Sequence, residues 1–180
     1  NQGAYQPRPT AKTYITSSPS MDISKASNFE RFVYLLLDKD SARVHELFEG
    51  VKSGQGFDLS DSMQTVNTRY GFAAGKSTHA DRLCTIKELY EQYGELVDPH
   101  TADGIQFAKE LQQRGEIVVC AETALPVKFA ETIIEAIGPI EIERPKHTEG
   151  LEDLEQHVII LDNDAELVAE QIRQQVEPNV

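Results

Sequence analysis

The sequence predicts an α/β domain that is rich in helices and contains few, short strands. Most segments repeat apolar residues at helical spacing, and short apolar runs lie between them. Polar or glycine-containing turns separate the two kinds of segment. The 180 residues suffice for a sizeable hydrophobic core, and no apolar run approaches the length of a membrane span. The alternation of helices with short strands indicates the α/β class.

The first part of the chain predicts an extended segment followed by three helices. Residues 1–26 are expected to run extended, because they are polar and contain three prolines. Ser27 or Asn28 can cap a first helix, which carries an apolar stripe from Phe29 to Leu37. A second helix is expected over 40–51, broken by glycines 54 and 56, and a third from residue 60 or 61 to about 71.

The middle of the chain predicts alternating strands and helices. A short strand is expected over 72–74, and a helix over 81–93 that starts at Thr78 or His79 and ends at Gly94. A helix over 101–113, a strand over 117–120 and a helix over 127–137 follow.

The end of the chain predicts a smaller strand–helix unit. We expect strands over 140–142 and 157–161, a polar linker over 145–152 and a closing helix over 164–176. The chain is therefore divided into three parts. They are a connecting segment (1–26), a helical region that includes part of a ligand-binding domain (27–138), and a C-terminal tail (139–180).

Charge and cysteine content restrict the partners and the compartment. The net charge of −13 argues against nucleic acid or an anionic membrane as a partner, since both require a basic surface. The first residue is Asn, which suggests a piece of a longer or processed chain, and the polar N-terminus does not predict a signal peptide. Cys84 and Cys120 lie in apolar patterns, which predict buried free thiols in a reducing cytoplasm.

Two polar loops form the region around which the chain is organised. One spans 98–101 and the other 122–123, and each opens a predicted helix. The second also follows the predicted 117–120 strand. Helix N-termini favour anionic groups, and open α/β sheets bind ligands at the carboxyl ends of strands. The two loops are therefore the first candidates for a ligand site.

Other local patterns admit two interpretations each. Residues 71–77, GFAAGKS, approach a phosphate-binding loop but have three residues between the glycines instead of four, so a turn is favoured. His79 with Asp81, and His100 with Asp98, can each be half of a metal or acid–base site. Without a third ligand at motif spacing, surface or capping roles are favoured and no metal site is predicted.

Several charged residues are candidates for anion binding. Asp22, Asn28 and Arg31 form a polar cluster in the sequence that can clamp a phosphate or carboxylate, or can simply be a capped helix with an exposed ion pair. Lys76 and Lys128 can act as nucleophiles or anion binders, or can be solvated. Lys128 lies in the first turn of a predicted helix, where a cation is unfavourable unless it meets an anion.

Four motifs together resemble the threonine synthases of bacteria. They are SPSMDIS at 18–24, SNFER at 27–31, DPHTA at 98–102 and ETALPVKF at 122–129, and the resemblance extends from about residue 5 to 176. It implies the C-terminal portion of a pyridoxal-phosphate enzyme of fold type II, similar to tryptophan synthase β. Such an enzyme converts O-phospho-L-homoserine and water to L-threonine and phosphate.

The resemblance also implies roles for particular residues. Thr123 would donate its hydroxyl to the pyridine nitrogen of the cofactor, with Glu122, His100 and Thr101 also in the cofactor site. Asp22, Asn28, Arg31 and Lys128 are candidates for substrate binding. The Schiff-base lysine and the loop that binds the cofactor phosphate would lie upstream, in a missing N-terminal part.

Two further expectations follow if the Schiff-base lysine and the phosphate-binding loop lie outside this chain. The chain alone would be inactive, and the 117–120 segment would expose an apolar face or an unpaired edge. The alternative function is a non-catalytic ligand-binding or interaction domain that shares the fold.

Overall fold

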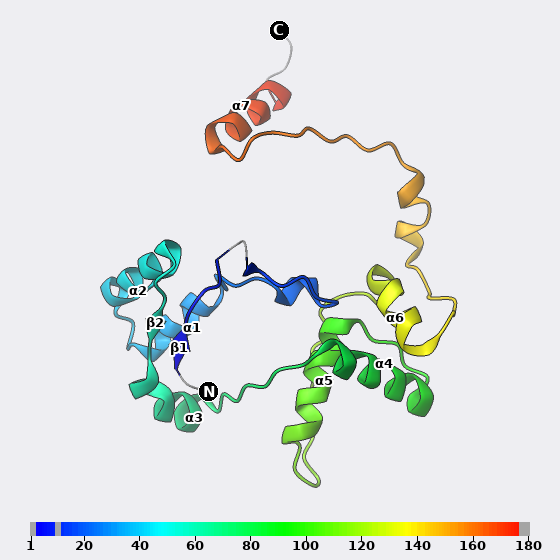
Figure 1. Cartoon of the computed structure of the whole chain (residues 1–180), viewed down its shortest axis with the longest axis horizontal. Helices are drawn as coiled ribbons and strands as arrows, with labels where there is room; N and C mark the ends of the chain where they lie inside the picture. The colour runs from blue at the N-terminus through cyan, green and yellow to red at the C-terminus, as the bar shows by residue number, and fades with distance from the viewer. Residues whose placement is uncertain (1–2, 10–11, 177–180) are drawn as a thin grey trace. The chain divides into compact units, whose positions relative to one another are not determined.

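The computed structural model describes residues 3–9 and 12–176, and most of its regular structure is helical (Figure 1). The chain divides into two compact units, Asn1–Glu143 and Arg144–Val180, and each is described by itself. The parts of the predicted connecting segment and tail at residues 1–2, 10–11 and 177–180 lie outside the described residues. The helix-rich fold class with few, short strands is confirmed.

Three helices and a two-stranded ladder form the first part of the larger unit. Helices α1 (Phe29–Leu36), α2 (Ser41–Ser53) and α3 (Met63–Tyr70) agree with the predicted helices, α3 being preceded by a 3₁₀ turn at Ser60–Ser62. The carboxylate of Asp40 caps α2 by accepting from the Arg43 N–H at 2.9 Å, and Gly54 ends the helix at a φ of 86°. Local capping residues therefore decide both ends of α2, whereas the N-caps of α1 and α3, Asn28 and Ser62, make no side-chain capping bond.

The core of this part is apolar and rich in aromatic rings. Strand β1 (Ala4–Tyr5) pairs antiparallel with β2 (Phe57–Asp58), and Tyr5 stacks on Phe29 and Phe57 at ring-centroid distances of 5.5 and 5.2 Å. The buried side chains of this aromatic core are Val33, Val44, Leu47, Val51 and Phe57. The sequence did not predict the two strands, because two residues are too few to produce an alternating pattern.

Three further helices form the second part of the same unit. Helices α4 (His79–Tyr93), α5 (Pro99–Leu111) and α6 (Ala130–Ile137) pack around Ile86, Ala102 and Ile133, which we call the second core. Thr78 and Asp81 form a reciprocal capping box at the start of α4, and Gly94 ends it at a φ of 71°. The predicted 127–137 helix is split into a 3₁₀ turn at Pro126–Phe129 and α6.

The predicted strands at 72–74, 117–120, 140–142 and 157–161 are wrong for this chain. The only ladder in the described ranges is β1–β2, and none of these four segments is paired. A strand requires a backbone partner, which the apolar pattern alone cannot supply. The side chains of Ile117 and Val119 are 91% and 88% exposed, which confirms the expected exposed apolar face.

The smaller unit contains two 3₁₀ turns, Lys146–Thr148 and Leu151–Asp153, and helix α7 (Ala165–Val176). Asp164 accepts hydrogen bonds from the N–H groups of Glu166 and Leu167 at 2.8 and 3.2 Å, so the predicted start of this helix is confirmed. Arg144 and Glu152 form an exposed ion pair at 2.6 Å across the predicted linker.

Two further predictions concern the cysteines and the membrane. Both thiols are free; Cys120 is partly buried, but Cys84 is exposed on α4, so its predicted burial is wrong. Cys84 is adjacent to an apolar residue in the sequence, but at helical spacing it does not fall on the packed face of α4. Among the described helices, none combines the length and apolar character that crossing a bilayer requires.

Candidate functional site

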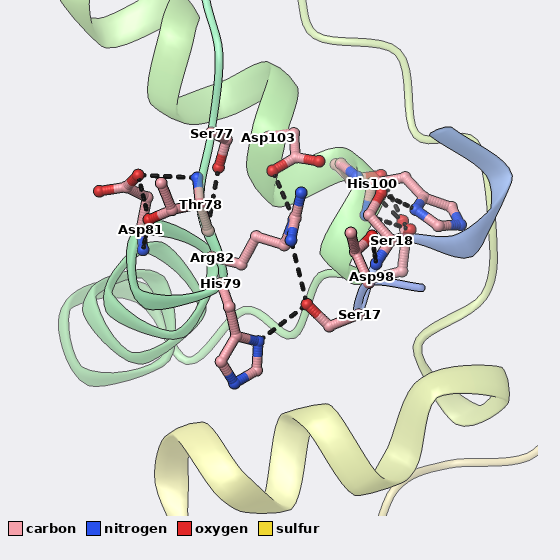
Figure 2. A network of polar contacts seen from close by, with 12 residues as sticks. Ser17, Ser18, Ser77, Thr78, His79, Asp81, Arg82, Asp98, His100 and Asp103 are labelled. Atoms are coloured by element: carbon pink, nitrogen blue, oxygen red, sulfur yellow. Dashed lines mark hydrogen bonds and ion pairs between the residues drawn. The ribbon is translucent and has the colours of Figure 1, made fainter. Parts of the chain in front are cut away.

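The candidate site is built where the segment 16–22 meets the starts of α4 and α5 (Figure 2). The Ser17 hydroxyl lies 2.9 Å from His79 Nδ1 on α4 and accepts a hydrogen bond from the Arg82 guanidinium at 3.2 Å. The Ser18 hydroxyl is fully buried and pairs with His100 Nδ1 on α5. Two consecutive serines therefore attach this segment to two different helices.

A buried ion pair joins α4 to α5 beside these serines. Arg82 Nε donates to Asp103 Oδ1 at 2.8 Å, and the two side chains are 8% and 20% exposed (Figure 2). Sequence reasoning did not select either residue. A signal was present, because Arg82 lies one helical turn before the buried Ile86 and hence on the packed face of α4. A charge in that position indicates a buried partner.

Asp98 is the N-cap of α5 and is fully buried. Its Oδ1 accepts from the N–H groups of His100 and Thr101 at 2.9 and 3.4 Å, and its Oδ2 accepts from the Thr101 hydroxyl. The capping interpretation of Asp98 is therefore confirmed. Asp81 likewise caps α4 together with Thr78, whose hydroxyl lowers the pKa of the Asp81 carboxyl.

The loop at 120–123 lies against the first turns of α5. The Thr123 N–H donates to the Thr101 hydroxyl oxygen at 3.4 Å, and Cys120 Sγ lies 3.9 Å from the Thr101 carbonyl oxygen. A Cβ atom at Gly104 would lie 2.7 Å from Cys120 Sγ, so a side chain at residue 104 would force the sulfur to move. Burial raises the pKa of the Cys120 thiol, and the nearby Asp98 carboxylate adds to the effect.

A cleft of about 870 Å³ opens beside these contacts. Its lining includes Arg8, Asp22, Lys76, Arg82, His100 and Thr123. Within the part of the chain that the structure describes, the Thr123 hydroxyl has no hydrogen-bond partner, and His100 Nε2 is buried without one. Buried polar atoms are nearly always paired, so an unpaired imidazole nitrogen beside a cleft indicates a missing partner.

The structure brings together three of the predicted cofactor residues and one of the predicted substrate residues. His100, Thr101 and Thr123 meet at the start of α5, and Asp22 lines the same cleft while it accepts from Thr16 N and Oγ1 at 2.9 and 2.8 Å. Glu122 is exposed and does not line the cleft.

The remaining predicted substrate residues lie elsewhere. Asn28 and Arg31 are exposed and line a separate pocket formed with α2, and Lys128 is exposed in the 3₁₀ turn before α6. The expected cluster of Asp22, Asn28 and Arg31 is therefore wrong. The reason is that Asp22 is drawn to Thr16 within its own segment, whereas α1 packs its apolar face against the aromatic core and presents Asn28 and Arg31 to solvent.

Comparison with known proteins gives consistent similarities. A family model described as "Threonine synthase, C-terminal" matches residues 101–172. The threonine synthase of Methylobacillus glycogenes is 49% identical over 167 residues, which are 92% of this chain and 35% of that protein. The threonine synthase of Corynebacterium glutamicum is 46% identical over 94% of this chain and 36% of its own length.

Solved structures give the same result. The pyridoxal-phosphate-bound threonine synthase from Brucella melitensis superposes with a TM-score of 0.80 at 33% identity, over 98% of this chain and 37% of that one. Yeast threonine synthase superposes with a TM-score of 0.74 at 25% identity, over 97% and 38% of the two chains. This chain thus spans little more than a third of the length of each of these relatives.

Proposed function

Because this chain belongs to the threonine synthase family, we propose that it forms the C-terminal part of an enzyme that makes threonine. The intact enzyme converts O-phospho-L-homoserine and water to L-threonine and phosphate, with pyridoxal phosphate as cofactor, in the cytoplasm. The observation that carries the proposal is the hydrogen bond between Thr123 N and Thr101 Oγ1. It joins the two loops that resemble the family at the edge of one cleft.

The residues around the cleft fit the cofactor. A volume of about 870 Å³ lies within the range of about 300–1,000 Å³ that is usual for small-molecule sites. The Thr123 hydroxyl has no hydrogen-bond partner among the described residues and offers a polar atom to a ligand, and His100 Nε2 is buried beside the cleft without a partner. When bound, pyridoxal phosphate supplies an electron sink for the bonds that are broken and formed.

We assign Thr123 the central role among the residues of this chain. Its hydroxyl would hold the pyridine nitrogen of the bound cofactor as a neutral hydrogen-bond donor, whereas a carboxylate in its place would keep that nitrogen protonated. The neutral donor thereby restrains how far the ring withdraws electrons. His100 lines the same cleft, Thr101 lies buried behind it as the acceptor of the Thr123 N–H, and Asp22 is the substrate candidate that the cleft retains.

The other groups that the reaction needs are assigned to the rest of the enzyme. The lysine that binds the cofactor covalently and the loop for its phosphate belong to the N-terminal part, which is the partner of this chain. The exposed apolar segment at 117–119 supports this assignment, because an unpaired apolar segment can be covered and paired by the rest of the enzyme. The chain alone is therefore inactive.

The test compares the 180-residue chain with the full-length protein that contains it. We expect phosphate release from O-phosphohomoserine with the full-length protein and pyridoxal phosphate, and none with the chain alone. In the full-length protein, Thr123→Val should lower turnover by about one to two orders of magnitude, because a buried acceptor loses its donor at about 1–3 kcal/mol. Thr123→Ser is the control and should retain most of the activity.

Two results would contradict the proposal. Wild-type turnover in Thr123→Val would remove the ring-nitrogen role from Thr123. A full-length protein that binds pyridoxal phosphate but releases no phosphate from the substrate would favour the non-catalytic alternative.

A further inference from the structure

We infer that Asp98 and Thr101 are positioning residues that hold Thr123 in place through its backbone. Neither residue need touch the ring nitrogen: Thr101 bonds the N–H of Thr123, and Asp98 orients the hydroxyl of Thr101. The inference rests on the proposed function of Thr123, and its test is designed to separate the two.

The Thr101 hydroxyl has a single proton, and this decides the direction of both its bonds. It donates the proton to Asp98 Oδ2, because an ionised carboxylate can only accept. The lone pairs of the same oxygen then remain for the Thr123 N–H. The carboxylate thus turns a freely rotating hydroxyl into an acceptor of fixed direction.

Asp98 can orient the hydroxyl because it is itself fixed. It is fully buried, and its Oδ1 accepts from the N–H groups of His100 and Thr101 in the first turn of α5. A carboxylate at a helix N-terminus is also stabilised by the helix dipole. The series of contacts therefore starts in a rigid helix and ends in the loop.

A second contact holds the other end of the loop. Cys120 Sγ lies against Gly104 of α5, where any Cβ would come within 2.7 Å of it, and 3.9 Å from the Thr101 carbonyl oxygen. The loop is thus attached to α5 at residue 120 and again at residue 123. Two attachments three residues apart restrict rotation of the peptide units between them.

The consequence is a Thr123 hydroxyl that is positioned before any ligand arrives. Its side chain is exposed at the cleft and has no partner among the described residues, so only its backbone restrains it. A contact that is held in place before binding costs less entropy when the ligand arrives. The geometry assigns that function to Thr101 and Asp98.

The test uses the full-length protein loaded with pyridoxal phosphate. Its variants are Thr101→Val, Thr101→Ser and Thr123→Val, with Thr85→Val as a matched control in a buried position of α4. We measure the absorbance band of the bound cofactor, the cofactor dissociation constant and amide hydrogen exchange at Thr123. Thr101→Val should shift the band in the same direction as Thr123→Val and weaken cofactor binding by about tenfold.

Hydrogen exchange and the conservative variant identify the mechanism. The Thr123 amide should exchange faster in Thr101→Val, whereas Thr101→Ser and Thr85→Val should match the wild type in all three measurements. If Thr123→Val shifts the band and Thr101→Val leaves the band and the exchange unchanged, the positioning role is refuted. If Thr123→Val itself leaves the band unchanged, the proposed role of Thr123 fails instead.

A second pair of variants tests the attachment of the loop at residue 120. Gly104→Ala should push the loop away from α5 through Cys120 Sγ, accelerate Thr123 exchange and weaken cofactor binding. Cys120→Ala removes the sulfur that attaches the loop to α5 and should also accelerate Thr123 exchange, although it introduces no clash. If Cys120→Ala leaves Thr123 exchange and cofactor binding at wild-type values, the loop is not held at residue 120 and this part of the inference is contradicted.

Discussion

The two cores of the larger unit bury different kinds of side chain. The aromatic core encloses Val33, Val44, Leu47, Val51 and Phe57, with Tyr5 and Phe29 packed on it. Among the residues that the structure describes, the second core encloses fully the apolar side chains of Ile86, Ala102 and Ile133. Around it the chain buries polar groups instead: Ser18, Arg82, Asp98, His100 and Thr101.

The aromatic core is stabilised mainly by close packing of apolar side chains, whereas the second core also depends on hydrogen bonds and ion pairs between its buried polar groups. Apolar side chains are stabilised by any well-packed surroundings, whereas a buried polar group costs free energy unless its hydrogen bonds are made. The second core accepts that cost at the starts of α4 and α5, next to the cleft. Four predictions test this contrast, from the largest expected effect to the smallest.

The first prediction compares two aspartates that cap helices. Asp98→Ala removes a buried carboxylate with three hydrogen bonds and should lower the free energy of unfolding by about 3 kcal/mol, the loss of a cap plus unpaired buried groups. Asp40→Ala removes an exposed cap of α2 and should cost about 1 kcal/mol. Urea titration of both variants measures the values. Equal losses of unfolding free energy in the two variants would show that the burial of Asp98 does not increase its contribution to stability.

The second prediction compares two arginine ion pairs. Arg82→Ala leaves Asp103 without its partner at the edge of the second core and should cost about 2 kcal/mol, below the usual cost of a fully buried pair because Asp103 is 20% exposed. Arg43→Ala breaks an exposed pair with Glu46 on α2 and should cost less than about 0.5 kcal/mol. The measurement is the midpoint of urea unfolding, compared between variants whose unfolding free energy depends equally steeply on urea concentration. A loss at Arg82 no greater than that at Arg43 would contradict the prediction.

The third prediction places a polar group in the wrong core. Val33→Thr keeps the shape but buries a hydroxyl in fully enclosed apolar surroundings, and should cost about 1–2 kcal/mol. Thr101→Val makes the opposite exchange in the second core and should cost about 1 kcal/mol, because the Asp98 carboxylate and the Thr123 N–H lose a partner. Thermal unfolding of the two variants checks the pair. A neutral Val33→Thr would mean that the aromatic core admits water.

The fourth prediction concerns pH and is the smallest, because the group is exposed. The Thr78 hydroxyl holds the pKa of Asp81 below its ordinary value of 3.8. A carboxyl whose pKa is lowered by folding contributes stability above its unfolded pKa, and the contribution is lost as the pH falls through the folded pKa. The melting temperature of Thr78→Val should therefore lie below that of the wild type at pH 7, and the gap should narrow below about pH 4. A difference in melting temperature that does not change with pH would show that the Thr78 side chain acts only through its hydrogen bond with the Asp81 N–H.

The sequence by itself determined several of the helix boundaries. Asp40, Thr78 and Asp98 cap three helices, and Gly54 and Gly94 end two of them. These signals work within one turn of the chain, so they are readable from neighbouring residues. The motifs at 98–102 and 122–129 also pointed to the family and to the two loops that meet at the cleft.

Only the tertiary structure decided which polar residues share a site. Ser18 and His100 are 82 positions apart, and Arg82 and Asp103 are 21 apart, so no local pattern pairs them. The same limit explains Asn28 and Arg31, which are close to Asp22 in sequence but line another pocket. It also explains the 117–120 segment, whose apolar pattern fits a strand that has no partner in the described chain. Capping is a property of adjacent residues, whereas strand pairing and buried ion pairs depend on groups that only folding brings together.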